Sequence, residues 1–288
     1  MKSARFAFGL CTLLCMLCSP AAYAWTYDPS SGSSTSHSVQ MRVGAEFTKK
    51  WDAGVALQIE EDLRFDLGGR LSELAGTATT PAVSAVPASF NKSYTTLSLS
   101  YKHPRFKYLK GDAGYTLKIM GNKNWSDVNK WMRHRLFFSL TGSYRYEQWS
   151  FSLRERFMTE IRMGDIDQLA EGSKILYEHN RADWFLRSKI EVAYHVMSKP
   201  LKPYVWIEMV NTLNANEVQN NGAQYIRRVR TTIGTVWKIN RSNALDFYYR
   251  FNYGYERDAN IKPNKGIIIL TEEKSFQHAI GIAYNFDW

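Results

Sequence analysis

The chain has 288 residues, a formal net charge of +10 and a mean hydropathy of −0.38. Beyond the first residues, no stretch is apolar over the roughly 20 residues that a membrane-spanning helix needs, which excludes a helical membrane protein. All three cysteines precede residue 19, so the rest of the chain has neither a disulfide framework nor a cysteine nucleophile. The basic balance could indicate nucleic-acid binding, but an export signal argues against nucleic acid and favours anionic lipids.

The first residues have the pattern of that export signal. Lys2 and Arg5 precede an apolar run from Phe6 to Cys18, and Ala22-Tyr23-Ala24 follows it. This is the order of basic region, apolar region and small-residue cleavage site in a signal peptide. We expect residues 1–24 to be removed, which leaves residues 25–288 as one domain. Because two basic residues and no acid are lost, the net charge of +10 falls to +8.

The rest of the chain alternates apolar and polar residues over segments of about ten residues. A tilted β-strand needs about this length to cross a membrane. The alternating segments are 39–49, 55–65, 95–102, 112–120, 135–144, 149–157, 184–194, 204–210, 228–238, 245–255 and 276–288. Segment 245–255 is the clearest, because every odd position in it is leucine or an aromatic residue. The pattern predicts strands with one apolar face.

Short and long connections alternate strictly between these segments. The short ones are 50–52, 103–110, 146–148, 198–202 and 240–242. The long ones are 67–93, 121–132, 163–183, 212–224 and 257–275. In bacterial barrels the short turns face the periplasm and the long loops face the cell exterior. We expect that orientation here.

The eleven segments conflict with the even strand number of single-chain bacterial barrels. We therefore expect about twelve strands, with ten as the alternative. Residues 25–37 could supply a weak first crossing or thread the lumen, or one segment could be misread. Residues 267–271 fit a hairpin within a loop better than a crossing.

A soluble β-sandwich would also alternate, but three features favour a membrane barrel. The segments are longer than the usual five or six residues of a strand. Aromatic residues gather near the turns, as in the interfacial girdles of barrels. The girdle candidates are Trp51, Tyr101, Tyr144, Trp149, Tyr194, Trp237, Phe286 and Trp288. The terminal strand, which ends on Phe286 and Trp288, is similar to the assembly signal of outer-membrane barrels.

The prediction is an all-β protein, an antiparallel transmembrane β-barrel in the outer membrane of a Gram-negative bacterium. Its expected partners are outer-membrane lipids and, through the terminal strand, the barrel-assembly machinery. The sequence indicates no cofactor and leaves the oligomeric state open.

Several strand fragments carry a family resemblance. They are Phe47-Thr48-Lys49-Lys50-Trp51, Glu60-Glu61-Asp62-Leu63-Arg64-Phe65, Arg133-His134-Arg135-Leu136, Pro203-Tyr204-Val205-Trp206-Ile207-Glu208-Met209, Arg227-Arg228-Val229-Arg230 before Gly234, Leu245-Asp246-Phe247-Tyr248-Tyr249-Arg250 and the closing 278–286. Over nearly the whole domain the chain resembles an uncharacterised family of Gram-negative outer-membrane barrels, classed as a domain of unknown function. The resemblance implies the barrel fold and the location, and no activity.

If the apolar face meets lipid, the polar face lines the lumen. We place Glu208 inward, because the opposite phase would put it on lipid, at about 2–4 kcal/mol for a mid-membrane charge and somewhat less for an acid. The predicted basic lumen residues are Arg42, Arg64, Lys118, Arg135, Arg154, Arg156, Arg187, Lys189, Arg228, Arg230, Lys238 and Arg250. The predicted acidic ones are Glu46, Glu60, Asp62, Glu191, Glu208 and Asp246.

This predominantly basic lumen has two interpretations. The charges can pair across neighbouring strands as a structural network, because buried charges demand partners and a barrel of this size is intermediate between filled and open forms. Alternatively, excess arginines form a narrow pore that favours anions. Arg154, Arg156, Arg228 and Arg230 would test the pore.

Two other classes of function stay open, an outer-membrane lipid-modifying or hydrolytic enzyme and a loop-mediated surface-binding protein. For an enzyme, His278 with Ser275, or His134 with an upstream acid, could form a base and nucleophile. No spacing requires either pair, and such sites are recognised by geometry, so we interpret these histidines as rim residues. Neither a phosphate-binding glycine loop nor a metal-binding motif is present, and loop length alone does not show binding.

Overall fold

The computed structural model describes residues 33–67, 71–74, 89–106, 108–121, 132–162, 182–214, 225–262 and 267–288. The strands of these residues are β1 (Ser33–Lys50), β2 (Val55–Asp66), β3 (Leu71–Leu74), β4 (Ser89–Lys102), β5 (Leu109–Met120), β6 (Met132–Tyr146), β7 (Trp149–Arg162), β8 (Ala182–Tyr194), β9 (Leu201–Thr212), β10 (Tyr225–Lys238), β11 (Asn243–Lys262) and β12 (Ile267–Asp287). Within the described part of the chain, no helix is long and apolar enough to cross a membrane.

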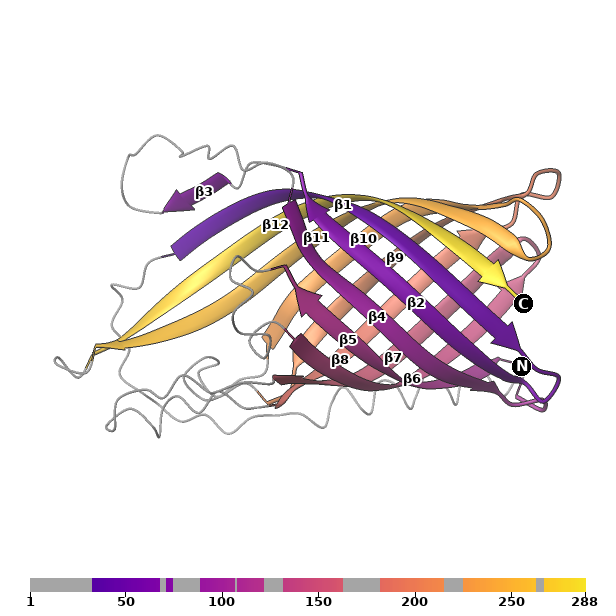
Figure 1. Ribbon diagram of the computed structural model, residues 1–288, viewed down its shortest axis with the longest axis horizontal. Helices are drawn as coiled ribbons and strands as arrows, with labels where there is room; N and C mark the ends of the chain where they lie inside the picture. The colour runs from indigo at the N-terminus through magenta and orange to yellow at the C-terminus, as the bar shows by residue number, and fades with distance from the viewer. Residues whose placement is uncertain are drawn as a thin grey trace.

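Eleven of these strands form one closed barrel with tilted strands (Figure 1). Each strand pairs antiparallel with the next, with β4 following β2, and β12 then pairs with β1. β3 lies outside this circle and pairs with the first residues of β1. Because the sheet closes on itself, the eleven strands have no free edge of the kind that a sandwich must protect.

The expected strand number, about twelve with ten as the alternative, is close to the eleven strands of this barrel, but the expected even parity does not hold. With eleven strands the first and last run in the same direction, and β1 and β12 form a parallel ladder from Ser33–Glu272 to Thr48–Asp287. Parallel hydrogen bonds are slanted but evenly spaced, so they can close a sheet. Residues 33–37 are the start of β1 and not a separate crossing, and residues 25–32 lie outside the described residues. The barrel is thus antiparallel except at this seam.

The hairpins β1–β2, β4–β5, β6–β7, β8–β9 and β10–β11 turn at one end of the barrel, here called the short-turn end. The chain also ends there, at Trp288 (Figure 1). The first of these turns needs a glycine, because Gly54 has φ +78° and an added Cβ would collide with the carbonyl oxygen of Lys102.

At the opposite end, the predicted loop 257–275 is mostly strand. β11 and β12 continue to pair from Arg257–Glu272 to Lys262–Ile267. Residues 267–271 therefore belong to a hairpin, as their sequence favoured. The other predicted long loops fall mainly outside the described residues.

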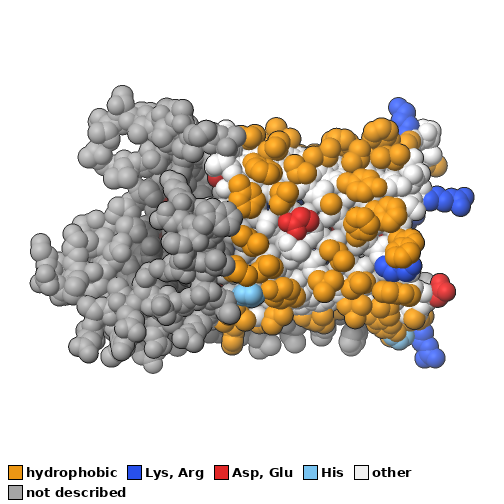
Figure 2. Space-filling view, viewed as in Figure 1, with side chains coloured by type: hydrophobic (Ala, Val, Ile, Leu, Met, Phe, Trp, Pro, Cys, Tyr) orange, Lys and Arg blue, Asp and Glu red, His pale blue; other side chains and the backbone are white. Residues whose placement is uncertain are grey.

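The outer surface of the barrel is covered by apolar side chains (Figure 2). Alternation along each strand places them there, for example Leu97 and Leu99 on β4 and Ile280 on β12, all exposed. Near the short turns the outer face carries exposed aromatic side chains, and Trp149 and Tyr194 lie with their ring centroids 4.9 Å apart. Lys and Arg side chains are visible at the short-turn end (Figure 2).

Inside the barrel, glycines make room for aromatic rings. An inward aromatic residue lies directly opposite a glycine of the neighbouring strand in three pairs, Phe137–Gly114, Tyr204–Gly234 and Tyr248–Gly281. A Cβ on any of these glycines would collide with the ring opposite. The glycines therefore leave room for these rings, and arginines lie over two of them, Arg156 over Phe137 and Arg42 and Arg250 over Tyr248.

Candidate functional site

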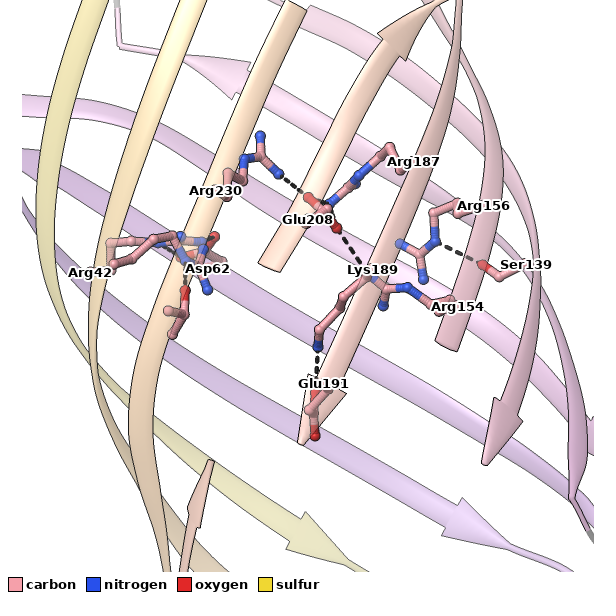
Figure 3. Close-up of polar contacts among 12 residues, drawn as sticks. Arg42, Asp62, Ser139, Arg154, Arg156, Arg187, Lys189, Glu191, Glu208 and Arg230 are labelled. Carbon is pink, nitrogen blue, oxygen red and sulfur yellow. Dashed lines mark hydrogen bonds and ion pairs between the residues drawn. The ribbon is translucent and has the colours of Figure 1, made fainter. Parts of the chain in front are cut away.

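Glu208 on β9 collects three arginines from three other strands (Figure 3). Arg154 donates to its Oε2 at 3.0 Å, Arg187 donates to both oxygens at 2.8 Å, and Arg230 donates to Oε1 at 2.8 Å. The side chain of Glu208 is only 1% exposed. Hydrogen bonds between charged groups are short and strong, so this carboxylate ties β7, β8 and β10 to β9 through the lumen.

Asp62 on β2 forms a second cluster with two arginines. Arg42 donates through Nε to Oδ1 at 3.1 Å, and Arg64 donates through Nε at 3.0 Å and Nη2 at 2.8 Å to Oδ2. Both arginines come from the inner wall formed by β1 and β2. One carboxylate here balances two cations.

Glu160 on β7 is the centre of a third cluster, which the sequence reasoning missed. It accepts hydrogen bonds from Lys118 at 3.2 Å and from Arg135 Nε at 2.6 Å. The alternation of segment 149–157, continued three residues further, would have placed Glu160 inward with Arg154 and Arg156. Arg135 was predicted as a lumen residue, but its partner was not.

Aromatic rings hold further cations against the wall. Trp206 lies between Lys189 Nζ, 4.7 Å from its ring centroid, and the guanidinium carbon of Arg250, 4.8 Å away. Lys189 also binds Glu191 at 2.6 Å, whereas Arg250 donates to the hydroxyl of Thr232 at 3.0 Å. Arg250 is therefore held by rings and a hydroxyl, since no carboxylate among the described residues pairs with it.

Three other inward cations also lack a carboxylate among the described residues. Arg156 donates to Ser139 Oγ at 2.7 Å and lies 4.0 Å above the ring of Phe137. Arg228 on β10 and Lys92 on β4 make no hydrogen bond or ion pair with any described residue. Of the four arginines singled out from sequence, the structure thus pairs Arg154 and Arg230 with Glu208 and leaves Arg156 and Arg228 without a carboxylate.

Further inward acids lie at both ends of the barrel. Those nearer the short-turn end are Glu46, Glu60, Asp112, Glu191 and Asp246. Glu46 and Glu60 are direct neighbours across β1 and β2, and Glu60 is exposed. Toward the opposite end, Asp66 accepts a hydrogen bond from Gln40 at 2.7 Å and Glu273 accepts one from Ser36 at 3.3 Å. The lumen therefore carries acids along its whole length, and the clusters differ in which cations these acids reach.

The predicted enzyme pairs do not assemble. His278 accepts or donates a hydrogen bond at 2.6 Å with the hydroxyl of Tyr249 on the outer face. Ser275, three residues earlier on β12, faces the lumen beside Gly254, because an odd spacing reverses the face of a strand. His134 likewise shares a hydrogen bond with the hydroxyl of Tyr115, at 2.6 Å, and contacts no acid among the described residues.

Two acids, Glu61 and Glu155, lie on the otherwise apolar outer face, and the alternation of β2 indeed places Glu61 on the face opposite Glu60. Glu61 accepts a hydrogen bond from Thr95 Oγ1 at 2.5 Å, and Glu155 accepts one from Ser188 Oγ at 2.7 Å. Each acid is six residues after the first residue of its strand, Val55 in β2 and Trp149 in β7. A hydroxyl from the next strand thus satisfies each carboxylate within the outer surface.

At the short-turn end, His195 follows β8 directly. The pKa of His195 is lowered from its ordinary value, first because burial disfavours the charged ring and then because Lys202, Arg145 and Lys238 repel a positive charge. Three basic side chains therefore lie close enough to His195 to repel a positive charge on its ring.

These features define a closed β-barrel with an apolar exterior and a charged lumen. The family described as "Protein of unknown function (DUF2490)" matches residues 34–262. The chain belongs to this DUF2490 family. No curated protein matches the sequence. The activity must therefore be argued from the lumen itself.

Proposed function

We propose that this protein is an outer-membrane barrel whose lumen is a narrow passage that favours anions. The closed sheet, the apolar outer face and the aromatic residues near the short turns support a membrane location. The N-terminal export pattern and the terminal strand ending on Phe286 and Trp288 support export and insertion by the barrel-assembly machinery. In this proposal the short turns face the periplasm and the opposite end faces the cell exterior.

The observation that carries the anion preference is the set of lumen cations without a carboxylate. Arg156, Arg228 and Lys92 face the lumen, and none has an ion pair with a described residue. Rings of basic side chains favour anions in selective channels. An anion that enters the lumen near these three side chains meets positive charge that no described carboxylate neutralises, whereas a cation is repelled.

The Glu208 cluster favours a second candidate, a barrel that is closed and structural. Its carboxylate is 1% exposed and its three arginines cross the lumen wall over four strands. Such a network narrows the passage. If it also blocks the passage, the barrel has a structural role and carries no current.

Planar-bilayer recording distinguishes these two functions. The purified full-length mature barrel is inserted into a bilayer with a KCl gradient, and the reversal potential gives the ratio of chloride to potassium permeability. We expect small currents with chloride favoured. The double change Arg156→Gln and Arg228→Gln should lower the permeability ratio severalfold, because it removes two uncompensated charges from the lumen.

A matched control uses Lys49, which lies on the outer face with its Nζ 3.6 Å from the ring centroid of Trp288. Lys49→Gln removes one charge without touching the lumen and should leave the permeability ratio unchanged. Silent bilayers from correctly folded protein would overturn the passage and leave the structural barrel. Lipid hydrolysis by the same preparation would support the enzyme instead.

A further inference from the structure

Like charges lie directly opposite each other at several places in the lumen, including Arg154–Lys189 and Arg156–Arg187, and one such pair lies away from the Glu208 cluster. Arg64 on β2 and Lys92 on β4 are register partners and share the inner face. Opposite charges stabilise such a cross-strand pair, and like charges destabilise it. The carboxylate that binds Arg64 is Asp62, which Arg42 already shares. Lys92 has no acid partner among the described residues.

A third cation reaches this place from another wall of the barrel. Arg228 belongs to β10, which is separated from β2 by β11, β12 and β1 in the strand order. Its guanidinium is nevertheless within electrostatic range of both Arg64 and Lys92. Glu256 is the acid that attracts Arg228, but Arg227 already forms an ion pair with that carboxylate. The three cations therefore converge across the lumen without a carboxylate of their own.

A mostly buried tyrosine lies among these cations. Tyr94 on β4 is 9% exposed, and its ring centroid lies 4.1 Å from the guanidinium carbon of Arg64 and 5.0 Å from that of Arg135. Its phenol group is also close enough to interact electrostatically with Lys92 and Arg228. The hydroxyl has no hydrogen-bond partner among the described residues, so it can donate to a ligand bound beside Arg64, Lys92 and Arg228.

We propose that Arg64, Lys92, Tyr94 and Arg228 form a binding site for a small free oxyanion of the phosphate type. A tetrahedral oxyanion has enough acceptors for all four groups, and the planar guanidinium group of arginine matches two of its oxygens at once. The ligand supplies the counter-charge that Lys92 and Arg228 do not find in an ion pair with any described residue. The site rests on the proposed function in one respect, because the anion reaches it through the lumen.

Isothermal titration of the folded full-length mature barrel in detergent with inorganic phosphate tests the site. We expect saturable binding that weakens at least tenfold in both Arg228→Gln and Lys92→Gln, since each removes a charge from one wall. Tyr94→Phe should weaken it about threefold through loss of one hydrogen bond, a change of the size expected for a neutral donor. Arg228→Lys keeps the charge, loses the two-point contact and should be intermediate. Lys49→Gln, on the outer face, is the control.

Two further measurements keep the result interpretable. Each variant must retain the heat-dependent gel shift of a folded barrel, and a variant that does not is replaced by its conservative change, Arg228→Lys or Lys92→Arg. Phosphatidic acid in the detergent micelles supplies the same phosphate chemistry from a lipid. Binding that requires this lipid, with none to inorganic phosphate, would overturn the free-anion site.

The site and the passage fail in different ways. No phosphate binding, or binding that Arg228→Gln and Lys92→Gln leave intact, overturns the site even when bilayer currents favour chloride. Silent bilayers together with phosphate binding that these variants abolish support the site and overturn the passage, and the lumen is then open from one end. Phosphate that lowers the chloride current of the unchanged protein but not of Arg228→Gln supports both.

Discussion

Two regions of the same lumen use arginine in opposite ways. Around Glu208 the arginines share one buried carboxylate, and every pair is within 3.0 Å. Around Lys92 the cations face one another with no carboxylate of their own. Strand β10 contributes to both regions, because Arg230 binds Glu208 and Arg228, two residues away on the same face, does not. Residue type and face therefore do not determine the role of a lumen arginine.

The difference between the two regions is the supply of carboxylates. A buried cation is costly unless it is paired, so the Glu208 cluster is stable by itself. The region of Lys92 must take its counter-charge from water or from a solute. The first region stabilises the barrel, and the second is available for binding. Each change below alters one region and leaves the other intact.

Glu208→Gln should have the largest effect on stability. It leaves three buried arginines without their shared anion, and breaking a buried ion pair from one side costs about 3–5 kcal/mol. The free energy of unfolding, measured by urea titration in detergent micelles, should fall by that amount. Glu60→Gln is the matched control, because Glu60 is an exposed lumen acid and has no ion pair with a described residue. Equal losses in both variants would contradict a special role for Glu208.

Arg230→Gln and Arg228→Gln compare the two regions on one strand. Arg230→Gln removes one charged hydrogen bond from Glu208 and should cost about 1.5–3 kcal/mol of unfolding free energy. Arg228→Gln removes a cation repelled by its neighbours and should change that free energy by no more than about 0.5 kcal/mol. The chloride permeability ratio should show the reverse order. Equal stability losses would mean that Arg228 has a structural partner.

The fold could be predicted from sequence further than the site could. Alternation with a period of two depends on which face of a strand is apolar, so it located all eleven barrel strands and the inward phase of residues such as Arg230 and Glu208. It carries no information about which strands meet at the seam. The parallel pairing of β1 with β12 is a non-local contact, and the parity rule applied in its place gave an even number where the barrel has eleven strands.

The pairing of lumen charges could not be predicted for a similar reason. Glu208 binds Arg154 across the intervening strand β8, where Lys189 is the register partner of both, and the sequence does not give this register. Counting charges along a strand gives their sum but not their depth, so the excess of cations around Lys92 was missed. Alternation places Glu60 and Glu61 on opposite faces of β2, but it does not reveal the hydroxyl of Thr95 that satisfies the outward acid.

Lys92→Glu should give the region around Lys92 a carboxylate that binds its arginines, as Glu208 does in the other region. The new carboxylate would lie opposite Arg64 and within electrostatic range of Arg228, and an opposite-charge pair across two strands adds up to about 1 kcal/mol. We expect a slightly higher unfolding free energy together with loss of phosphate binding. Lys92→Gln, which removes the charge without replacing it, should lose phosphate binding without the gain in stability. A stable Lys92→Glu barrel that still binds phosphate would contradict the comparison.

The smallest expected effect is on the pKa of His195, at the short-turn end of the barrel. Lys202, Arg145 and Lys238 lower the pKa of His195, with burial as the larger cause. The folded protein therefore binds a proton at His195 less readily than the unfolded chain does. The contribution of His195 to stability is fully present above the ordinary histidine pKa and is lost as the pH falls through the lowered pKa of the folded protein.

Lys202→Gln should raise the pKa of His195, as measured by NMR titration of the ring protons, because one repulsive charge is lost. His103, in the turn between β4 and β5 and away from these three cations, is the internal control. An unchanged pKa of His195 would mean that burial alone sets it and that the cations near His195 are neutralised by solvent ions, unlike those around Lys92.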